Sequence, residues 1–429
     1  MIDFDEEFYL QTNPDVERLV SIGLFDCGFT HYCLNGKYEN RLWSNSLISK
    51  NFNLKAHYPD GMVKPVNIRP KLRYEPIDKP LKKSTEPYLL ILFGHLQRSL
   101  FYAGYRAFFR DFDAVFPMFD KIVLSVEFDP IETELATQYC NRIEVIGQKD
   151  LYDTEIMPDL IICFSNHLFA KALKLFNRPQ RMIYYCQEYE AGFFPFGIEF
   201  IEAEKAVAYS QNLIVSTVVL RDFLAGKGLL NATRIFVSSP EIETFDVKPG
   251  SSRKLFFYFR PEYFHTRNLP EIIWEAVHEF CNKNHNYDLY LVGTIDTSFS
   301  FHLNGNRIYV LSKLPNDAYI ELISSCEAVV SMIYSAHPGV VAYQAAASGI
   351  PTVTNVFENR NAAYLRQMSE NIVPYDPVTD SLAEKIEEAM LMPKGRKSFR
   401  NELYAGNDQA PLTGFIFEIL NQDENNTLE

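Results

Sequence analysis

Basic residues follow apolar runs of strand length in the second half of the chain. Arg260 comes directly after the run 254–259, and Lys313 lies just beyond the run 307–311. Because the carboxyl ends of parallel strands meet at one edge of a sheet, we expect the two side chains on the same side. A guanidinium and an ammonium placed there can bind a diphosphate and neutralise the charge that develops on a nucleotide leaving group. Each residue taken alone is better explained as an ordinary surface charge, and it is their placement together at strand ends that favours a function.

The stretch 329–361 has the pattern of a buried strand, a loop, a small-residue helix and a second strand. Pro338 suits the first helical turn, where its missing N–H costs nothing, and Gly349 suits a C-cap. The alanines between them make a thin helix whose N-terminus, from Gly339 on, favours an anion such as a diphosphate. His337 at its entry can hydrogen-bond a phosphate or a sugar hydroxyl, or simply cap the helix. The whole pattern also fits a plain βαβ crossover.

Strands and helices alternate in two runs along the chain. The predicted strands are 88–94, 121–126, 142–146, 159–164, 181–186, 212–215, 233–237, 254–259, 287–292, 307–311, 328–333 and 351–354. The predicted helices are 102–116, 131–139, 166–176, 199–208, 218–226, 268–283, 316–325, 339–348, 360–370, 379–391 and 412–420. Such alternation implies parallel sheets with helices on both faces. The sequence therefore predicts an α/β protein with two Rossmann-like domains facing a cleft.

We divide the chain into five parts. They are a helical module (1–43), a connector (44–87), a first Rossmann-like domain (88–240), a second Rossmann-like domain (250–395) and a terminal helix with an acidic tail (396–429). In the module, Asn13-Pro14-Asp15 starts a helix that Gly23 stops. Six prolines mark the connector as extended. The terminal helix is expected to cross back onto the first domain.

The composition excludes several classes of protein. A net charge of −14 argues against a nucleic-acid enzyme, whose affinity needs a basic face. Seven scattered cysteines without a CxxC pair fit buried thiols in a reduced compartment better than disulfides or a zinc site. The N-terminus is acidic where a signal peptide would be basic, and no apolar run approaches the ~18 residues of a membrane span. We therefore expect a cytoplasmic protein whose membrane contact, if any, is peripheral.

A D-x-D pair, Asp111 and Asp113, is the one pattern that suggests a metal. It falls well along a predicted helix and not on a loop at a strand end. We therefore interpret both aspartates as solvated surface and expect no metal site.

Several stretches resemble GT-B glycosyltransferases. They are SAHPG (335–339), AASG (346–349), TNVFENRN (354–361) and the longer segments 184–217, 258–277 and 310–332. Together they resemble the retaining family-4 type and its relatives, and are most similar to bacterial rhamnosyltransferases that build rhamnan chains from dTDP-rhamnose. The resemblance covers residues 88–420. The module 1–43 is similar to a short helical unit found beside bacterial glycosyltransferases and surface proteins, where it either pads the domain or docks a partner.

The resemblance implies that the first domain binds the acceptor and the second binds the nucleotide sugar. It places phosphate-binding residues at Arg260 and Lys313, with Arg267 and His265 as weaker candidates on the following loop. In the loop 355–361, Glu358 is expected to touch the donor sugar. No metal or other cofactor is expected, because the basic residues and the helix N-terminus would do the work of a cation.

The chain departs from the family-4 pattern in the thin helix. Retaining enzymes of that family carry two glutamates separated by seven residues, which by register from Gly349 would fall at Ala336 and Gln344. Gln344 can still hydrogen-bond ribose hydroxyls through its amide. The missing first carboxylate puts a retaining mechanism in doubt, although the rhamnosyltransferase relatives also lack it.

An inverting displacement would need a base from the first domain to take the proton of the acceptor hydroxyl. Glu188 and Glu190 follow the predicted strand 181–186, and we rank them first and second. His95, in FGHLQRS, and His167, in SNH, are further options after other strands. The competing interpretation is that an acidic residue after a strand caps the next helix.

These patterns predict a glycosyltransferase that moves a sugar from a nucleoside diphosphate to a bacterial surface polysaccharide. The resemblance implies that the sugar is L-rhamnose. The growing polysaccharide that accepts the sugar can be lipid-linked. UDP-linked sugars stay open as donors. One alternative is a catalytically degenerate GT-B protein that only binds sugar or docks a partner through residues 1–87. The other is a nucleotide-sugar epimerase on the same fold.

Overall fold

The structure is a computed structural model. It describes residues 4–21, 23–36, 41, 81–98, 100–101, 103–152, 154–238, 242–250, 252–295, 297–337, 339–405 and 411–421. Most of the predicted connector, together with Pro338 and the acidic tail, lies outside these residues. The described residues fall into two compact units. Unit 1 draws them from Met1–Arg69, Ile242–Tyr334 and Pro338–Arg400, and unit 2 from Pro70–Glu241, Ser335–His337 and Asn401–Glu429.

Unit 2 is built on a seven-stranded parallel sheet of order β4-β3-β2-β6-β7-β8-β9. Its strands are β2 (Tyr88–Leu96), β3 (Lys121–Ile131), β4 (Ile143–Gly147), β6 (Leu160–Cys163), β7 (Met182–Cys186), β8 (Asn212–Val215) and β9 (Arg234–Val237), and the pair β1 (Lys82–Lys83) and β5 (Ile156–Met157) forms a small separate sheet. The central strands are continuous apolar runs because helices cover both faces.

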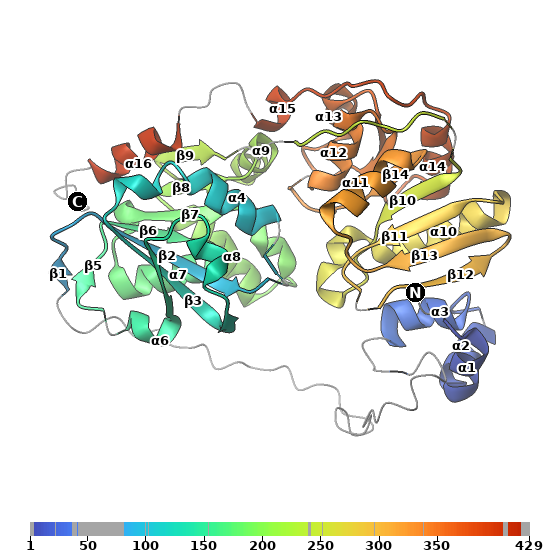
Figure 1. The fold of residues 1–429 in the computed structure, drawn as a ribbon, viewed down its shortest axis with the longest axis horizontal. Helices are drawn as coiled ribbons and strands as arrows, with labels where there is room; N and C mark the ends of the chain where they lie inside the picture. The colour runs from blue at the N-terminus through green and yellow to red at the C-terminus, as the bar shows by residue number, and fades with distance from the viewer. Residues whose placement is uncertain are drawn as a thin grey trace. The chain divides into compact units, whose positions relative to one another are not determined.

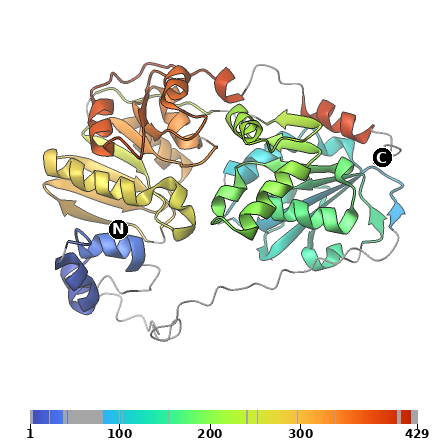
Figure 2. The ribbon, with the colours of Figure 1, turned by 180° about the vertical axis from the view of Figure 1, so that it is seen from behind.

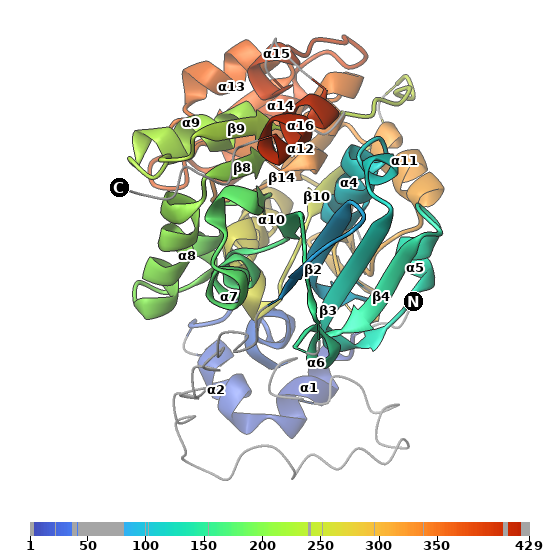
Figure 3. The ribbon, with the colours of Figure 1, turned by 90° about the vertical axis from the view of Figure 1, so that its left-hand side faces the viewer.

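The helices of unit 2 are α4 (Ala103–Phe112), α5 (Glu134–Thr137), α6 (Gln148–Leu151), α7 (Asn166–Phe176), α8 (Ile198–Tyr209), α9 (Val218–Gly226), α15 (Glu402–Ala405) and α16 (Leu412–Leu420), with short 3-10 turns η4 (Phe116–Met118), η5 (Pro179–Arg181) and η6 (Glu190–Phe193). Helices α4 and α16 share one aromatic core with the sheet, and α7 and α8 lie side by side on the other face (Figure 3). Arg181 donates to the carbonyls of Ile419 (3.0 Å) and Leu420 (2.8 Å), which anchors α16.

Unit 1 contains the second sheet, of order β12-β13-β11-β10-β14-β15-β16. Its strands are β10 (Lys254–Tyr258), β11 (Asp288–Val292), β12 (Phe299–Leu303), β13 (Asn306–Leu311), β14 (Ala328–Ser331), β15 (Thr352–Asn355) and β16 (Ile372–Tyr375). Its helices are α10 (Pro270–Lys283), α11 (Asn316–Ser325), α12 (Val340–Ser348), α13 (Ala362–Met368) and α14 (Leu382–Met390), with the 3-10 turn η7 (Tyr263–Asn268). Helices α10 and α14 pack on one face of the sheet and α11 and α12 on the other (Figure 1).

The predicted α/β class with two Rossmann-like domains is confirmed by the two seven-stranded sheets. Two strands of the seven-stranded sheets were missed, besides the short strands β1 and β5 of the small separate sheet. The strand β12 runs antiparallel to β13, and the two are joined by Asn304-Gly305, both of which have positive φ. This dipeptide is the common signal of a tight hairpin, which a search for strand–helix alternation passes over. The other missed strand, β16, is the edge strand next to β15.

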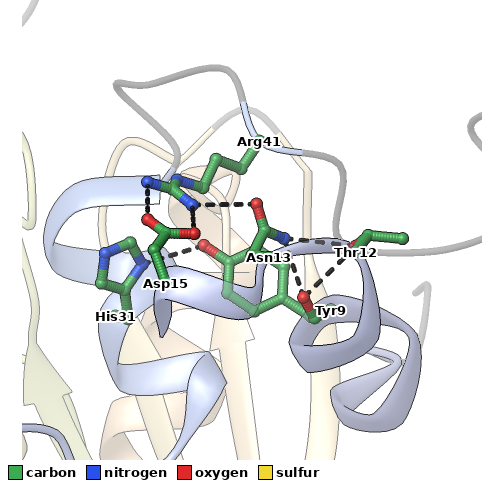
Figure 4. Close-up of polar contacts among 6 residues, drawn as sticks. All are labelled: Tyr9, Thr12, Asn13, Asp15, His31 and Arg41. Carbon is green, nitrogen blue, oxygen red and sulfur yellow. Dashed lines mark hydrogen bonds and ion pairs between the residues drawn. The ribbon is translucent and has the colours of Figure 1, made fainter. Parts of the chain in front are cut away.

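The N-terminal module consists of α1 (Glu6–Thr12), α2 (Pro14–Ser21), α3 (Gly28–His31) and the π-helical turn η1 (Tyr32–Gly36). The sequence predicted the helix from Pro14 but missed α1, which Asp5 caps by accepting from Phe8 N at 2.9 Å. Polar contacts join its parts (Figure 4): the hydroxyl of Tyr9 lies 3.0 Å from Nδ1 of His31, and Arg41 binds Asp15 through two hydrogen bonds.

The module packs on the β12 edge of the unit 1 sheet and on α10 (Figures 1 and 2). The Phe29 ring lies 4.8, 4.7 and 4.3 Å from the rings of Trp274, Phe299 and Phe301. Nε1 of Trp274 donates to Oγ1 of Thr30 at 2.7 Å. Because Phe29 belongs to the same hydrophobic core as α10 and the sheet, the described part of the module is an integral part of unit 1.

Candidate functional site

A basic cluster lies at the carboxyl end of β10 in unit 1. Nη1 of Arg260 donates to the hydroxyl of Tyr258 at 3.0 Å, and its Nε lies 3.2 and 3.3 Å from the two carboxylate oxygens of Glu262. These contacts hold the Arg260 side chain at the sheet edge, where it is only 17% exposed. A guanidinium has five N–H donors. Within the described residues, these hydrogen bonds use two of the five N–H groups of Arg260.

His265 and Arg267, on η7, extend this cluster. Burial, together with the positive charges of Arg260 and Arg267, lowers the pKa of His265 to about 3. Burial opposes the charge of Arg260, but Tyr258 and Glu262 raise its pKa, so the guanidinium stays ionised. A neutral imidazole beside two cations marks a region of positive potential. Diphosphate binding by Arg260 and Arg267 stays a prediction. It requires a positive potential of this kind, because a diphosphate is an anion.

Gly293, at the end of β11, lets the backbone of the neighbouring strand come close. A Cβ on Gly293 would lie 1.7 Å from the carbonyl oxygen of Phe259 and 3.5 Å from Cδ of Arg260. Only glycine fits at such a separation without moving backbone. The sequence analysis did not single out Gly293, Tyr258 or Glu262. Their position at strand ends beside Arg260 is the signal that would have identified them.

Lys313 and Gln344 lie elsewhere in unit 1. Lys313 is exposed just beyond β13, which is separated from β10 only by β11 and is parallel to it. Its side chain therefore starts from the same edge of the sheet as Arg260. Gln344 is buried on α12, where its Oε1 accepts from the hydroxyl of Tyr319 at 3.2 Å. That contact ties α12 to α11, and a ribose contact of Gln344 stays a prediction.

The thin helix α12 begins at Val340, one residue later than predicted, with Gly339 as its N-cap at φ +74°. The C-cap at Gly349 is confirmed: φ is +98°, and its N–H donates to the carbonyls of Ala345 and Ala346. Seven residues of α12, from Ala342 to Ser348, are buried. The small side chains therefore serve close packing on the sheet, as the crossover interpretation requires. Anion binding at the N-terminus of α12 stays a prediction.

The loop before α12 is held at its base by side chains of the motif TNVFENRN. Asn355 accepts from Ile333 N at 2.7 Å and donates to Ile333 O at 3.1 Å. Arg360, which is fully buried, donates to the same carbonyl at 2.6 Å. Glu358, the residue expected to touch the donor sugar, is exposed on the turn between them with φ +45°. The motif thus fixes the loop, and sugar contact by Glu358 stays a prediction.

In unit 2, Glu188 binds the tripeptide that contains His337. Its Oε1 accepts from the backbone N of Tyr189 at 2.9 Å, from the hydroxyl of Ser335, and from the backbone N of His337 at 3.1 Å. Three donors on one oxygen give Glu188 an anchoring role for this loop. Its assignment as the base stays a prediction.

Glu190, two residues after Glu188, is half-buried. Its Oε2 accepts from the backbone N of Asn166 at 2.7 Å, at the start of α7. Burial raises its pKa to about 7 despite this hydrogen bond. The geometry is that of a helix cap, the competing interpretation stated for acids after strands, and a role for Glu190 in catalysis stays a prediction.

A second polar cluster surrounds the ends of β2 and β3. Nε2 of His167 lies 2.6 Å from Oε2 of Glu127, and Lys171 Nζ lies 4.0 Å from the other carboxylate oxygen. His95 stacks on Phe128 at 4.7 Å and interacts electrostatically with Glu127 and His167. The structure therefore brings two of the candidate bases together. The sequence analysis missed Glu127, although it directly follows the predicted strand 121–126.

The interpretation of the D-x-D pair is half wrong. Asp113 is exposed, as expected. Asp111 instead accepts from the hydroxyls of Tyr185 (2.7 Å) and Ser238, because the end of α4 turns it towards β7 and β9. In the described ranges, no group of three or more His, Cys, Asp or Glu residues is arranged to hold a metal ion. The expectation that no metal is needed stays a prediction.

One family model matches part of the chain. Residues 253–387 match the family model described as WsaF, C-terminal domain. This match spans β10 to α14, and so includes Arg260, Lys313 and α12. No curated protein sequence matches the chain significantly.

Solved structures with a similar chain arrangement include sugar-active proteins. Sucrose-phosphate synthase from Thermosynechococcus elongatus has a TM-score of 0.49 and 12% identity over 78% of this chain and 94% of its own. The lipopolysaccharide outer core galactosyltransferase WaaB in its apo form has a TM-score of 0.47 and 12% identity, over 77% of this chain and 95% of its own. A putative UDP-N-acetylglucosamine 2-epimerase from Listeria monocytogenes has a TM-score of 0.44 and 13% identity, over 80% of this chain and 100% of its own. At these scores the likenesses decide neither the fold nor the reaction.

Within the part of the chain that the structure describes, every helix is too short or too polar to span a bilayer.

Proposed function

We propose that the chain is a glycosyltransferase that moves a sugar from a nucleoside diphosphate donor to a bacterial surface polysaccharide. The proposed donor is dTDP-L-rhamnose. The observation that carries the proposal is the match of residues 253–387 to the WsaF C-terminal domain, a rhamnosyltransferase domain. A cytoplasmic site of action and an acceptor that can be lipid-linked belong to the same proposal.

The basic cluster of unit 1 supports this function. The hydrogen bonds of Arg260 use two of its five N–H groups, and Arg267 adds a second positive charge nearby. Lys313 starts from the same sheet edge, and Gly339 opens α12. Charge-assisted hydrogen bonds from such groups bind a diphosphate and stabilise the charge on the departing nucleotide, the task that a metal ion performs in other transferases. We therefore propose metal-independent transfer.

The test is calorimetric titration of the full chain with dTDP, UDP and GDP, in EDTA and again with Mg²⁺. Metal-independent binding of dTDP in the micromolar range, followed by release of dTDP from dTDP-L-rhamnose, is the expected result. Preference for UDP would keep the transferase and replace the donor. Failure to bind any of the three nucleotides would refute the proposal.

The degenerate sugar-binding protein is the second candidate. It is favoured by one observation, the presence of Ala336 and Gln344 where family-4 enzymes carry glutamates. Gln344 is engaged with Tyr319, as expected of a residue kept for packing. Nucleotide binding without any transfer or hydrolysis would favour this candidate. Interconversion of two free nucleotide sugars would favour an epimerase.

A further inference from the structure

The imidazole of His167 is held at both of its nitrogens. Nε2 lies 2.6 Å from Oε2 of Glu127, and Nδ1 lies 2.9 Å from Oγ of Ser165. An ionised carboxylate can only accept, so in the neutral ring the proton sits on Nε2. Nδ1 then carries the lone pair, which the Ser165 hydroxyl meets as a donor. The tautomer of His167 is thus set by its neighbours and leaves Nδ1 as the basic atom.

The exposure of these groups suits a base and its supporting residue. The His167 side chain is 46% exposed, whereas those of Glu127 and Lys171 are only 6% and 2% exposed. Burial would raise the pKa of Glu127, but the hydrogen bond from His167 and the charges of His167 and Lys171 lower it. Glu127 is therefore an ionised, buried carboxylate whose hydrogen-bonded partner faces solvent. This is the arrangement of a base oriented by a third group.

The groups that face the imidazole come from several elements. The titratable ones are Glu127 on β3, His95 on β2, Lys171 on α7, Glu190 on η6 and Tyr152 just after α6, beside Glu127 and Lys171. Burial lowers the pKa of Lys171 to about 8 and also lowers that of His95. Among these groups, the pair His167–Glu127 has the shortest contact.

The other candidates are engaged in ways that limit them as bases. Three donors meet Oε1 of Glu188, two of them from the loop Ser335–His337. Glu190 is half-buried, and its carboxylate accepts from the first backbone N–H of α7. The His167 side chain, by contrast, is half-exposed, and among the described residues its Nδ1 meets only a serine hydroxyl, a partner that an acceptor hydroxyl can replace.

We propose that His167, oriented by Glu127, is the general base that deprotonates the acceptor hydroxyl. The inference rests on the proposed function. In the step, the hydroxyl proton moves to Nδ1 while the acceptor oxygen forms a bond to the anomeric carbon. The bond from that carbon to the diphosphate oxygen breaks, and the nucleoside diphosphate leaves with the electron pair. The imidazolium is stabilised by Glu127 and afterwards releases its proton to water.

The test compares His167→Gln, Glu127→Gln and Glu188→Gln in the full chain. The readouts are dTDP affinity by calorimetry and transfer from dTDP-L-rhamnose to methyl α-L-rhamnoside. His302→Gln, at an exposed position on β12 of unit 1, is the matched control. His167→Gln should keep dTDP affinity within twofold and lower kcat by about 100-fold or more, the usual scale of a general base. The control should change neither.

Glu127 acts through His167, so it is a positioning residue and its readout is the pH profile. Without the carboxylate the imidazolium is less stable, so the acidic limb of kcat should move to lower pH in Glu127→Gln. A loss of activity without that movement would overturn the role of Glu127. This second variant also tests the proposal should His167→Gln fold poorly.

Two results separate the failures. If the parent chain binds no nucleotide and releases none, the proposed function falls and this inference falls with it. If the parent is active and His167→Gln keeps full kcat, the inference alone is overturned. A 100-fold loss confined to Glu188→Gln would assign the base to Glu188 instead.

Discussion

Removing one hydroxyl tests whether the N-terminal module is part of unit 1. Thr30→Val keeps the shape of the side chain but takes away the acceptor for Nε1 of Trp274, 2.7 Å away. Trp274 is 1% exposed and Thr30 is 5% exposed, so water cannot replace the lost partner. A buried donor left unsatisfied costs about 1–3 kcal/mol. Because no cavity forms, this cost is the whole expected effect.

The assay uses the scarcity of tryptophan in this chain. Of its two tryptophans, Trp43 lies outside the described residues, and Trp43→Phe leaves Trp274 as the single reporter. For a urea m-value of about 3 kcal/mol/M, the expected loss lowers the midpoint followed by Trp274 fluorescence by about 0.3–1 M. The m-value should stay the same, because the extent of buried surface is unchanged.

Thr12→Val in the same background is the control. Thr12 is exposed on α1, and exposed substitutions change stability by less than about 0.5 kcal/mol. Equal midpoints for Thr30→Val and Thr12→Val would refute the packing of the module on α10. Phe29→Ala, which removes a ring packed against three others, should cost more, about 3–5 kcal/mol.

The remaining predictions concern the candidate site. Arg260→Ala should weaken dTDP binding by about 1–3 kcal/mol in calorimetry, and unchanged affinity would remove it from the phosphate site. Gly293→Ala should lower the free energy of unfolding in urea titration by about 1–3 kcal/mol or more, because its Cβ meets backbone. Gly414→Ala on α16, with open space around it, should not lower it, and equal stabilities of the two variants would contradict the close approach. Asn355→Ala should weaken dTDP binding, because Asn355 holds the loop at Ile333. Retained affinity together with unchanged stability would show that the hydrogen bonds of Asn355 to Ile333 do not contribute to binding. The pKa of His265 is about 3 in the folded chain and near 6.5 when unfolded, so the unfolded state binds the extra proton and stability falls as pH drops from 6.5 towards 3. His265→Gln should flatten that slope in urea titrations at several pH values, and an identical slope would contradict the burial argument.

Local signals were sufficient for most of the strands and helices. The strand 212–215 and the helices 166–176, 218–226 and 316–325 were predicted with the bounds that the structure has. Some of these bounds are set by a residue with a clear local role. Thr217, for example, caps α9 by accepting from Leu220 N at 3.1 Å. Information of this kind lies within a few residues of chain and does not depend on the rest of the fold.

The candidate site was predictable only in part, because its pairings depend on strand order. Arg260 and Lys313 could be placed at strand ends, but the contact of Arg260 with Glu262 depends on how the chain turns after β10. Glu127 and His167 are 40 residues apart and meet because β2 lies between β3 and β6 in the sheet. Periodicity cannot supply that order, so the pair was not foreseen.

The contact between Thr30 and Trp274 spans 244 residues of sequence. A ribosome that adds about 5–20 residues per second needs about 12–50 s to make the intervening chain. Throughout that interval Phe29 and its neighbours have no partner surface, while most of unit 2 is being synthesised. During this time the nascent module exposes apolar side chains to which chaperones can bind and through which nascent chains can aggregate. The order of synthesis therefore favours aggregation during the production of this protein.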